Sequence, residues 1–227
     1  TFHAYTDPAR TAGWGNTTVS SINAQFSTST KGQWTLNPAV IYGRVDAGQT
    51  SAVPGSYSYA SNAITMAVNF VKSTAGSPSD CQGLALNPTT QTLTATASVV
   101  QTCTVSTTTL NFGTPGLLNA NVDGTSTITT QCASGTAYQI GLDNGLHASG
   151  TTRQMAGGSS ELIAYELYRD SSRTQRWGNT LNSDTVSISG TANTGAALTT
   201  TVYGRVAAQS TPSPSSYSDT ITVTVTY

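Results

Sequence analysis

The chain has 227 residues and a net charge of −1, and charged residues make up only 8% of it, against roughly 25% in an ordinary soluble protein. This length suits one large β domain or two ordinary ones. The weak charge argues against a nucleic-acid or anionic-membrane partner, the short apolar runs are too short to span a bilayer, and the many Thr, Val and Tyr residues argue against disorder.

Apolar and polar residues alternate with a period of two along much of the chain, which is typical of half-buried β-strands. In chain order, the pattern predicts strands over residues 2–5, 19–27, 40–45, 62–70, 92–99, 161–168, 186–188 and 220–227. The stretch 161–168 could also form a short helix, but its alternation favours a strand. Turn-forming segments separate these strands, so the sequence predicts an all-β sandwich.

An internal repeat organises the chain. Three blocks recur in the same order: residues 5–16 as 168–179, 40–45 as 201–206, and 64–70 as 221–227. The offset falls from 163 to 161 and then to 157, as expected for loops of different length in two copies of one domain. The sequence therefore indicates a duplicated domain.

The two copies are unequal. The second runs from Thr90 to Tyr227, whereas residues 1–70 match only its latter half. A half sandwich exposes its core face and unpaired strands, so we expect about sixty residues to precede Thr1 or another chain to fill their place. We place an N-terminal half domain with its junction at residues 1–88 and a C-terminal domain at residues 89–227.

Three cysteines are present: Cys81, Cys103 and Cys132. Their spacing is not that of a zinc site, and a secreted protein with one disulfide and one odd cysteine fits better. The partner of Cys81 is expected in the absent half of the first copy. A free, buried thiol is the alternative.

Several motifs of the second copy now point to a family. They are Cys103-Thr104-Val105-Ser106, Leu110-Asn111-Phe112-Gly113, Cys132, Tyr168 with Asp170, Val202-Tyr203-Gly204-Arg205, and the ending from Tyr217 to Tyr227. Together they resemble the spore coat protein U domain, the pilin module of archaic (Csu-type) chaperone–usher pili. The resemblance covers residues 90–227, and residues 1–70 resemble half a module.

The resemblance implies two immunoglobulin-like β-sandwich domains, the first represented by its latter half and the second lacking one strand. A periplasmic chaperone, and later the N-terminal extension of an adjacent pilin, would donate that strand. The groove that receives it would be bordered by Ile221, Val223, Val225 and Tyr227. The alternative is that these four are ordinary core residues of a complete sandwich.

The resemblance also implies a disulfide between Cys103 and Cys132. It would close a loop of about thirty residues and stabilise the fold by roughly 3.5 kcal/mol. A metal site is the competing interpretation, and no histidine lies near either cysteine in the sequence.

A two-module member of this family resembles a pilus-tip adhesin. Its expected partners are the chaperone, an outer-membrane usher, the adjacent pilin, and an abiotic or host surface to which it attaches during biofilm formation. It would pass through the periplasm into the extracellular fimbrium of a Gram-negative bacterium. The alternative is a structural shaft or spore-coat-type subunit without an adhesive role.

Two loops of the first copy are candidates for surface attachment. The segment 28–39 carries Trp34, Leu36 and Pro38, where the second copy has only small, mostly polar residues. Large apolar side chains on a loop often mark a binding surface, although Trp34 could instead fold back onto the sandwich. If residues 81–87 form no strand, the distal candidates become those of the loop 46–61, namely Val53, Tyr57 and Tyr59.

The sequence predicts no enzyme, cofactor or metal site. It has only two histidines, His3 and His147, and lacks both a nucleophile elbow and a phosphate-binding glycine loop. Asp7 and Asp170 occupy matching positions in the two copies, so we expect matched turns there rather than acid–base groups.

Overall fold

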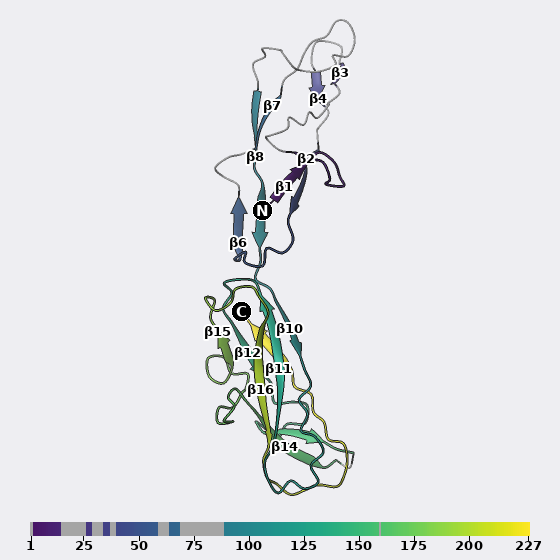
Figure 1. The fold of residues 1–227 in the computed structure, drawn as a ribbon, viewed down its shortest axis with the longest axis vertical. Helices are drawn as coiled ribbons and strands as arrows, with labels where there is room; N and C mark the ends of the chain where they lie inside the picture. Colours follow the sequence, from purple (N-terminus) through teal and green to yellow (C-terminus); the bar gives the residue numbers. More distant parts are fainter. Residues whose placement is uncertain are drawn as a thin grey trace. The chain divides into compact units, whose positions relative to one another are not determined.

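The computed structural model describes residues 2–14, 26–28, 34–36, 40–58, 64–68, 89–158 and 160–227. All secondary structure that these residues form is β-strand, as the sequence predicts (Figure 1). In this part of the chain no helix is long and apolar enough to cross a membrane. Residues Thr1–Gln49 and Thr50–Tyr227 form two compact units. The domain boundary between residues 88 and 89 lies within the second of these units and stays a prediction.

The described residues of the first unit form two small antiparallel sheets. Strands β2 (Gly13–Trp14), β1 (Phe2–Tyr5) and β5 (Tyr42–Val45) form one in that order, and β3 (Phe26–Thr28) pairs with β4 (Trp34–Leu36) in the other. The prediction of a loop over residues 28–39 is therefore wrong at Trp34–Leu36. That tripeptide alternates apolar, polar and apolar residues, a pattern typical of a strand. It pairs antiparallel with β3.

The second unit contains a two-sheet sandwich. Its larger sheet has the order β10 (Cys103–Thr107), β11 (Val122–Cys132), β16 (Leu198–Val206), β14 (Leu162–Tyr168) and β13 (Arg153–Ala156). Its smaller sheet has the order β15 (Val186–Ile188), β12 (Tyr138–Leu142) and β17 (Val223–Thr226). Two further pairs, β6 (Gly55–Ser58) with β9 (Thr96–Val99) and β7 (Ile64–Val68) with β8 (Thr89–Leu93), precede it in the chain. The segment 161–168 forms β14, so the strand prediction for it is confirmed over the helix.

The core of the sandwich lies between these two sheets. Its buried side chains come from β11, β12, β14 and β16, from Leu118 before β11, and from the loop that carries Trp177. The Trp177 side chain is fully buried, and its indole nitrogen donates to the carbonyl oxygen of Ile140 at 2.8 Å, which ties the loop to β12. Buried Arg153 donates to the carbonyl oxygens of Leu142 and Trp177 and pairs with Glu166. Its charge is thus compensated, as a buried charge requires.

The repeat read from the sequence forms the same turn twice. The Asp7 carboxylate accepts hydrogen bonds from the backbone amides of Thr11 and Ala12, and Asp170 accepts them from Thr174 and Gln175. The hydrogen bond from the Ala12 amide is the main cause that lowers the pKa of Asp7. For Asp170, partial burial opposes ionisation, but the amides of Gln175 and Thr174 outweigh it and lower the pKa. Both carboxylates therefore shape turns, as expected from their matching positions.

The arginine of each turn also recurs in geometry. Arg10 and Arg173 have φ angles of 57° and 55°, uncommon for residues other than glycine. Their Nε atoms donate to the carbonyl oxygens of Gly43 and Gly204 at 3.0 and 3.1 Å. Each turn is thereby fixed to the strand that carries the second repeated block, β5 or β16.

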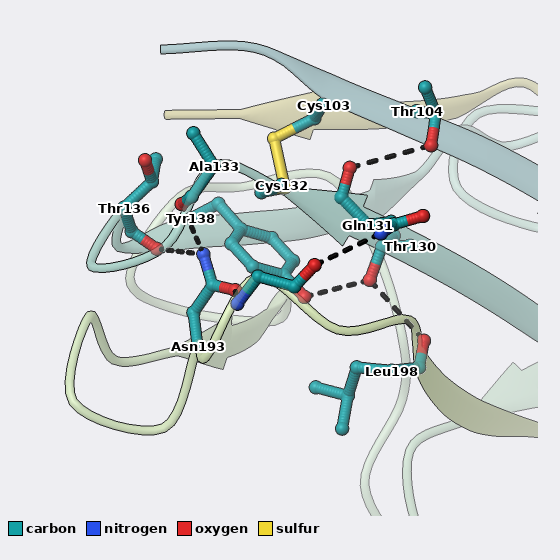
Figure 2. Close-up of a disulfide and its surroundings, with 11 residues drawn as sticks. Cys103, Thr104, Thr130, Gln131, Cys132, Ala133, Thr136, Tyr138, Asn193 and Leu198 are labelled. Atoms are coloured by element: carbon teal, nitrogen blue, oxygen red, sulfur yellow. Dashed lines mark hydrogen bonds between the residues drawn. A yellow bond between two sulfur atoms is a disulfide. The ribbon is translucent and has the colours of Figure 1, made fainter. Parts of the chain in front are cut away.

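A disulfide joins the start of β10 to the end of β11 (Figure 2). Cys103 and Cys132 are directly opposite in the ladder, and their sequence separation is 29 residues. The Asn193 side-chain amide nearby donates to the carbonyl oxygens of Ala133 and Thr136, at 2.8 and 3.0 Å. The disulfide and this amide together hold the turn after β11. Cys81 lies outside the described residues.

Two glycines face each other across β11 and β16 and make room for another segment. Gly124 pairs with Gly204. A β-carbon on Gly124 would lie 2.9 Å from the carbonyl oxygen of Asn111, and one on Gly204 would lie 2.7 Å from the Leu110 side chain. The chain after β10 therefore crosses this sheet at a distance that only glycine permits.

We predict that Gly124→Ala lowers the free energy of unfolding by about 1–3 kcal/mol, because the added methyl group meets a backbone oxygen that cannot rotate away. Gly116→Ala is the matched control, since a β-carbon there meets no atom within 4 Å, and its effect should stay within about 0.5 kcal/mol. Urea unfolding followed by tryptophan fluorescence measures both. Equal effects of the two variants would contradict the close approach.

Asp123 on β11 forms an ion pair that links the stability of the fold to pH. A hydrogen bond from Arg205, aided by the charge of Arg173, lowers the pKa of Asp123 below its usual value of 3.8. Because the folded state binds this proton more weakly than the unfolded chain, the pair stabilises the fold above that value. This stability is lost as the pH falls through the lowered pKa.

We therefore predict that Asp123→Asn loses less stability than the parent protein between about pH 5 and about pH 2, a range that includes the usual pKa of 3.8. Thermal unfolding followed by circular dichroism at several pH values measures the difference. Parallel curves for the two proteins would argue against this linkage.

Candidate functional site

The second unit contains an open groove beside β17. It is a cavity of about 540 Å³, bordered on one side by residues 107–112 after β10 and on the other by residues 217–221 and Val223. Its floor consists of inward-facing side chains of the sandwich, among them Ile128, Leu142 and Val202. The groove thus opens onto the hydrophobic core.

The groove leaves core side chains uncovered on one side. Protein interiors pack as densely as organic crystals, so a core side chain is normally surrounded by neighbouring atoms. Side chains that line an open groove lack the contacts that a covering segment would give them. The arrangement is therefore suited to receive an apolar or extended polypeptide segment.

The strand at the rim has a free edge. Among the described residues, β17 pairs with β12 alone and lies at the end of the smaller sheet. Asp143 donates its amide to the carbonyl oxygen of Thr222 at 3.2 Å, so even-numbered residues of this segment face β12. Because bonding directions alternate along an antiparallel strand, the amide and carbonyl groups of Val223 and Val225 point toward the free edge.

The structure locates the four residues expected to border the groove. Ile221 and Val223 line the cavity and, like Val225, are partly buried against the core cluster. Tyr227 is 54% exposed. The intervening threonines, Thr222, Thr224 and Thr226, are exposed. The alternation read from the sequence is present, and the role of these residues in strand donation stays a prediction.

One end of the groove is polar. The Asp219 side chain is 2% exposed and accepts hydrogen bonds from the Tyr165 hydroxyl at 2.8 Å and the Leu146 amide at 2.9 Å, and it contacts His147 Nδ1 at 3.1 Å. Burial, followed by the hydrogen bond to Asp219, strongly raises the pKa of Tyr165, so this phenol stays protonated. These bonds fix the start of β17 relative to β14.

The counterpart of β17 in the first copy has a partner that follows it in the chain. Residues 64–70 match residues 221–227 in the repeat, and β7 lies in the former segment. β7 pairs antiparallel with β8, from Ile64 opposite Leu93 to Val68 opposite Thr89. Each of the two repeated segments thus pairs with one described strand, β7 with β8 and β17 with β12.

A family model describes this part of the chain. The Spore Coat Protein U domain model matches residues 89–224, which is more than half of the sequence. The chain belongs to this family. The family assignment made from the sequence motifs is confirmed.

Two comparisons extend this result. The chain is 34% identical over 133 residues to Protein U of Myxococcus xanthus, covering 52% of this chain and 72% of that protein. Its fold is also similar to a chain in the crystal structure of the CsuC–CsuE chaperone–tip adhesion subunit pre-assembly complex, from archaic chaperone–usher Csu pili of Acinetobacter baumannii. The TM-score is 0.50 at 21% identity, over 82% of this chain and 64% of that one. The likeness supports the immunoglobulin-like fold expected from the sequence.

The residues predicted for surface attachment fall in different places. Trp34 and Leu36 lie in β4, and Pro38 and Tyr59 are outside the described residues. Val53 and Tyr57 are exposed, and the Tyr57 hydroxyl donates to the carbonyl oxygen of Val53 at 2.7 Å. Their attachment role stays a prediction.

Sequence reasoning missed the opposite wall of the groove. Leu110, Asn111 and Phe112 belong to a family motif in the sequence, but the motif does not predict that residues 107–112 cross the sheet and border the groove. The glycines Gly124 and Gly204 carry the signal that could have revealed it, since facing glycines in adjacent strands mark a close backbone approach. The buried polar end at Asp219 has no comparable signal in the sequence.

Proposed function

We propose that this chain is a non-enzymatic subunit of a chaperone–usher pilus and that a strand from another protein completes its second copy. The open groove beside β17 carries this proposal. An added strand would bond to the free backbone groups of Val223 and Val225, and its alternate side chains would fill the cavity. Main-chain bonds give such a strand its affinity, and the shape of the cavity selects its side chains.

The fold comparison also supports strand donation. The structure to which this fold is similar comes from a complex of a pilus chaperone with a tip subunit. The partners proposed here are accordingly a periplasmic chaperone first, and then an adjacent pilin delivered by an outer-membrane usher. The protein would travel through the periplasm to an extracellular fimbrium.

We predict that Val223→Lys and Val225→Lys abolish complex formation with the periplasmic chaperone of the same pilus system. Val223→Lys places a charge in the apolar groove, and Val225→Lys places one against the adjoining core, where burial without a partner is costly. Thr224→Lys is the matched control, because Thr224 lies on the same strand and faces away from the core. Co-expression followed by affinity capture of the chaperone measures the complex. Capture of all three variants in equal amounts would refute the groove as the donor-strand site.

We further propose that the chain is the tip subunit and attaches to surfaces through apolar residues of its first copy. The presence of a second, partial copy supports a tip position, since shaft subunits of such pili resemble single modules. Attachment by a few apolar side chains is weak for each molecule, at roughly 25 cal/mol per Å², and many pili on one cell would strengthen it by avidity. A structural shaft or coat subunit is the alternative.

We predict that Trp34→Ala combined with Leu36→Ala reduces attachment of piliated cells to plastic several-fold at unchanged pilus number. The matched control is Leu146→Ala with Leu181→Ala, which removes two exposed apolar side chains from the second copy. Crystal-violet staining with pilus counts by electron microscopy measures the effect. If attachment is unchanged, the same assay on Val53→Ala with Tyr57→Ala tests the second candidate loop, and if both pairs attach normally the adhesin proposal is rejected in favour of a structural subunit.

A further inference from the structure

The first unit has an open sheet edge of its own, along β5. β5 is the counterpart of β16 in the repeat, and β1 is the counterpart of β14. β16 lies between β14 and β11, whereas β5 pairs, among the described residues, with β1 alone. The register is the same in both copies, with His3 opposite Arg44 and Glu166 opposite Arg205. The edge of β5 that faces away from β1 therefore corresponds to the edge of β16 that binds β11.

The valines at the ends of β5 and β16, Val45 and Val206, differ in exposure. Val206 is 2% exposed and lies opposite Val122 of β11. Its counterpart Val45 is 61% exposed. The same residue type at the same register position is thus core in one copy and surface in the other. Among the described residues, the first copy has no strand in the place of β11.

The glycines two residues earlier, Gly43 and Gly204, differ in the space above the sheet. A β-carbon on Gly204 would lie 2.7 Å from Leu110 and 3.0 Å from Phe112. A β-carbon on its counterpart Gly43 would meet no atom within 4 Å. A glycine retained where nothing approaches it is consistent with a segment like residues 110–112 crossing β5 in the complete molecule.

The arginines between these residues, Arg44 and Arg205, differ in their acidic partners. Arg205 donates from Nε and Nη2 to the two carboxylate oxygens of Asp123, at 2.7 and 2.9 Å. This carboxylate lies directly opposite on β11. Arg44 instead donates to the Tyr5 hydroxyl at 2.8 Å, and its Nε lies 4.0 Å from Asp46, which follows its own strand. Its guanidinium also lies over the Tyr5 ring, 5.1 Å from the centroid. Among the described residues, no carboxylate lies opposite Arg44 on the free side of β5, where Asp123 lies opposite Arg205.

We propose that the β5 edge receives a β-strand of the β11 type from polypeptide outside residues 1–227. The strand runs antiparallel to β5 with an acidic residue opposite Arg44, a glycine opposite Gly43 and an apolar residue opposite Val45. Two apolar side chains from the segment that precedes it cover Gly43. Because β11 precedes β14 in the second copy, this strand precedes β1 in the same polypeptide. The inference is independent of the groove beside β17.

A synthetic peptide of residues 107–130 tests the chemistry, because it carries Leu110, Phe112 and the Val122-Asp123-Gly124 run and contains no cysteine. Added to the 227-residue chain, it should slow hydrogen exchange at residues 42–45 and leave residues 222–226 unchanged. Arg44→Glu should weaken binding about tenfold, because it replaces an attraction by a repulsion. The Asp123→Lys form of the peptide should restore binding to that variant.

A second variant guards against misfolding of Arg44→Glu. Val45→Lys should also weaken binding, because it places a charge where the strand is apolar. Absence of protection at residues 42–45, or protection that neither variant changes, overturns the proposal. The peptide should fail to bind the protein isolated from its natural source, in which the edge is already filled in cis. Binding to that form as well would place the strand on another chain and overturn the assignment ahead of β1.

Discussion

The structure depends on the covering of a sheet edge that borders a hydrophobic core. The last strand, β17, contributes Val223 and Val225 to the core on one face, and it directs their backbone groups away from its only described neighbour. Unpaired backbone groups beside apolar side chains are costly unless water or another strand satisfies them. Both the groove and its proposed occupant follow from this requirement. A partner strand supplies the missing bonds and the missing packing at once, whereas a loop of side chains would supply only the packing.

The two copies permit a comparison that a single domain would not. The turn at Asp7 and the turn at Asp170 share their hydrogen bonds, and the arginines after them share a left-handed φ and a glycine carbonyl acceptor. These features form from residues close in sequence or on the paired strand, so they persist in both copies. Burial does not persist, since Val45 and Val206 differ widely in exposure. Local geometry thus follows from the sequence of each copy, and burial follows from the strands that surround it.

This difference explains what the sequence could predict. Alternation along residues 161–168 and 186–188 was sufficient to place β14 and β15, because a half-buried strand shows its two faces in its sequence. The family motifs identified the disulfide partners. Trp34-Thr35-Leu36 also alternates and forms β4. Comparison with the small, mostly polar residues of the matching segment in the second copy suggested a loop instead. The crossing of residues 107–112 and the buried carboxylate of Asp219 depend on contacts between distant segments. No local pattern encodes them.

The composition is itself consistent with strand addition. Natural sheet edges are commonly protected against pairing by lysine, proline or inward-pointing charges. This chain has only Lys31 and Lys72, and its last strand presents threonines on the outer face. An edge of this kind remains able to pair with any extended segment of suitable shape, including a second copy of itself. If a strand is donated to this edge, as proposed above, the same absence of charge that lets the strand bind also leaves the edge open to wrong partners before assembly. This is the physical reason for proposing that a chaperone holds the subunit until then.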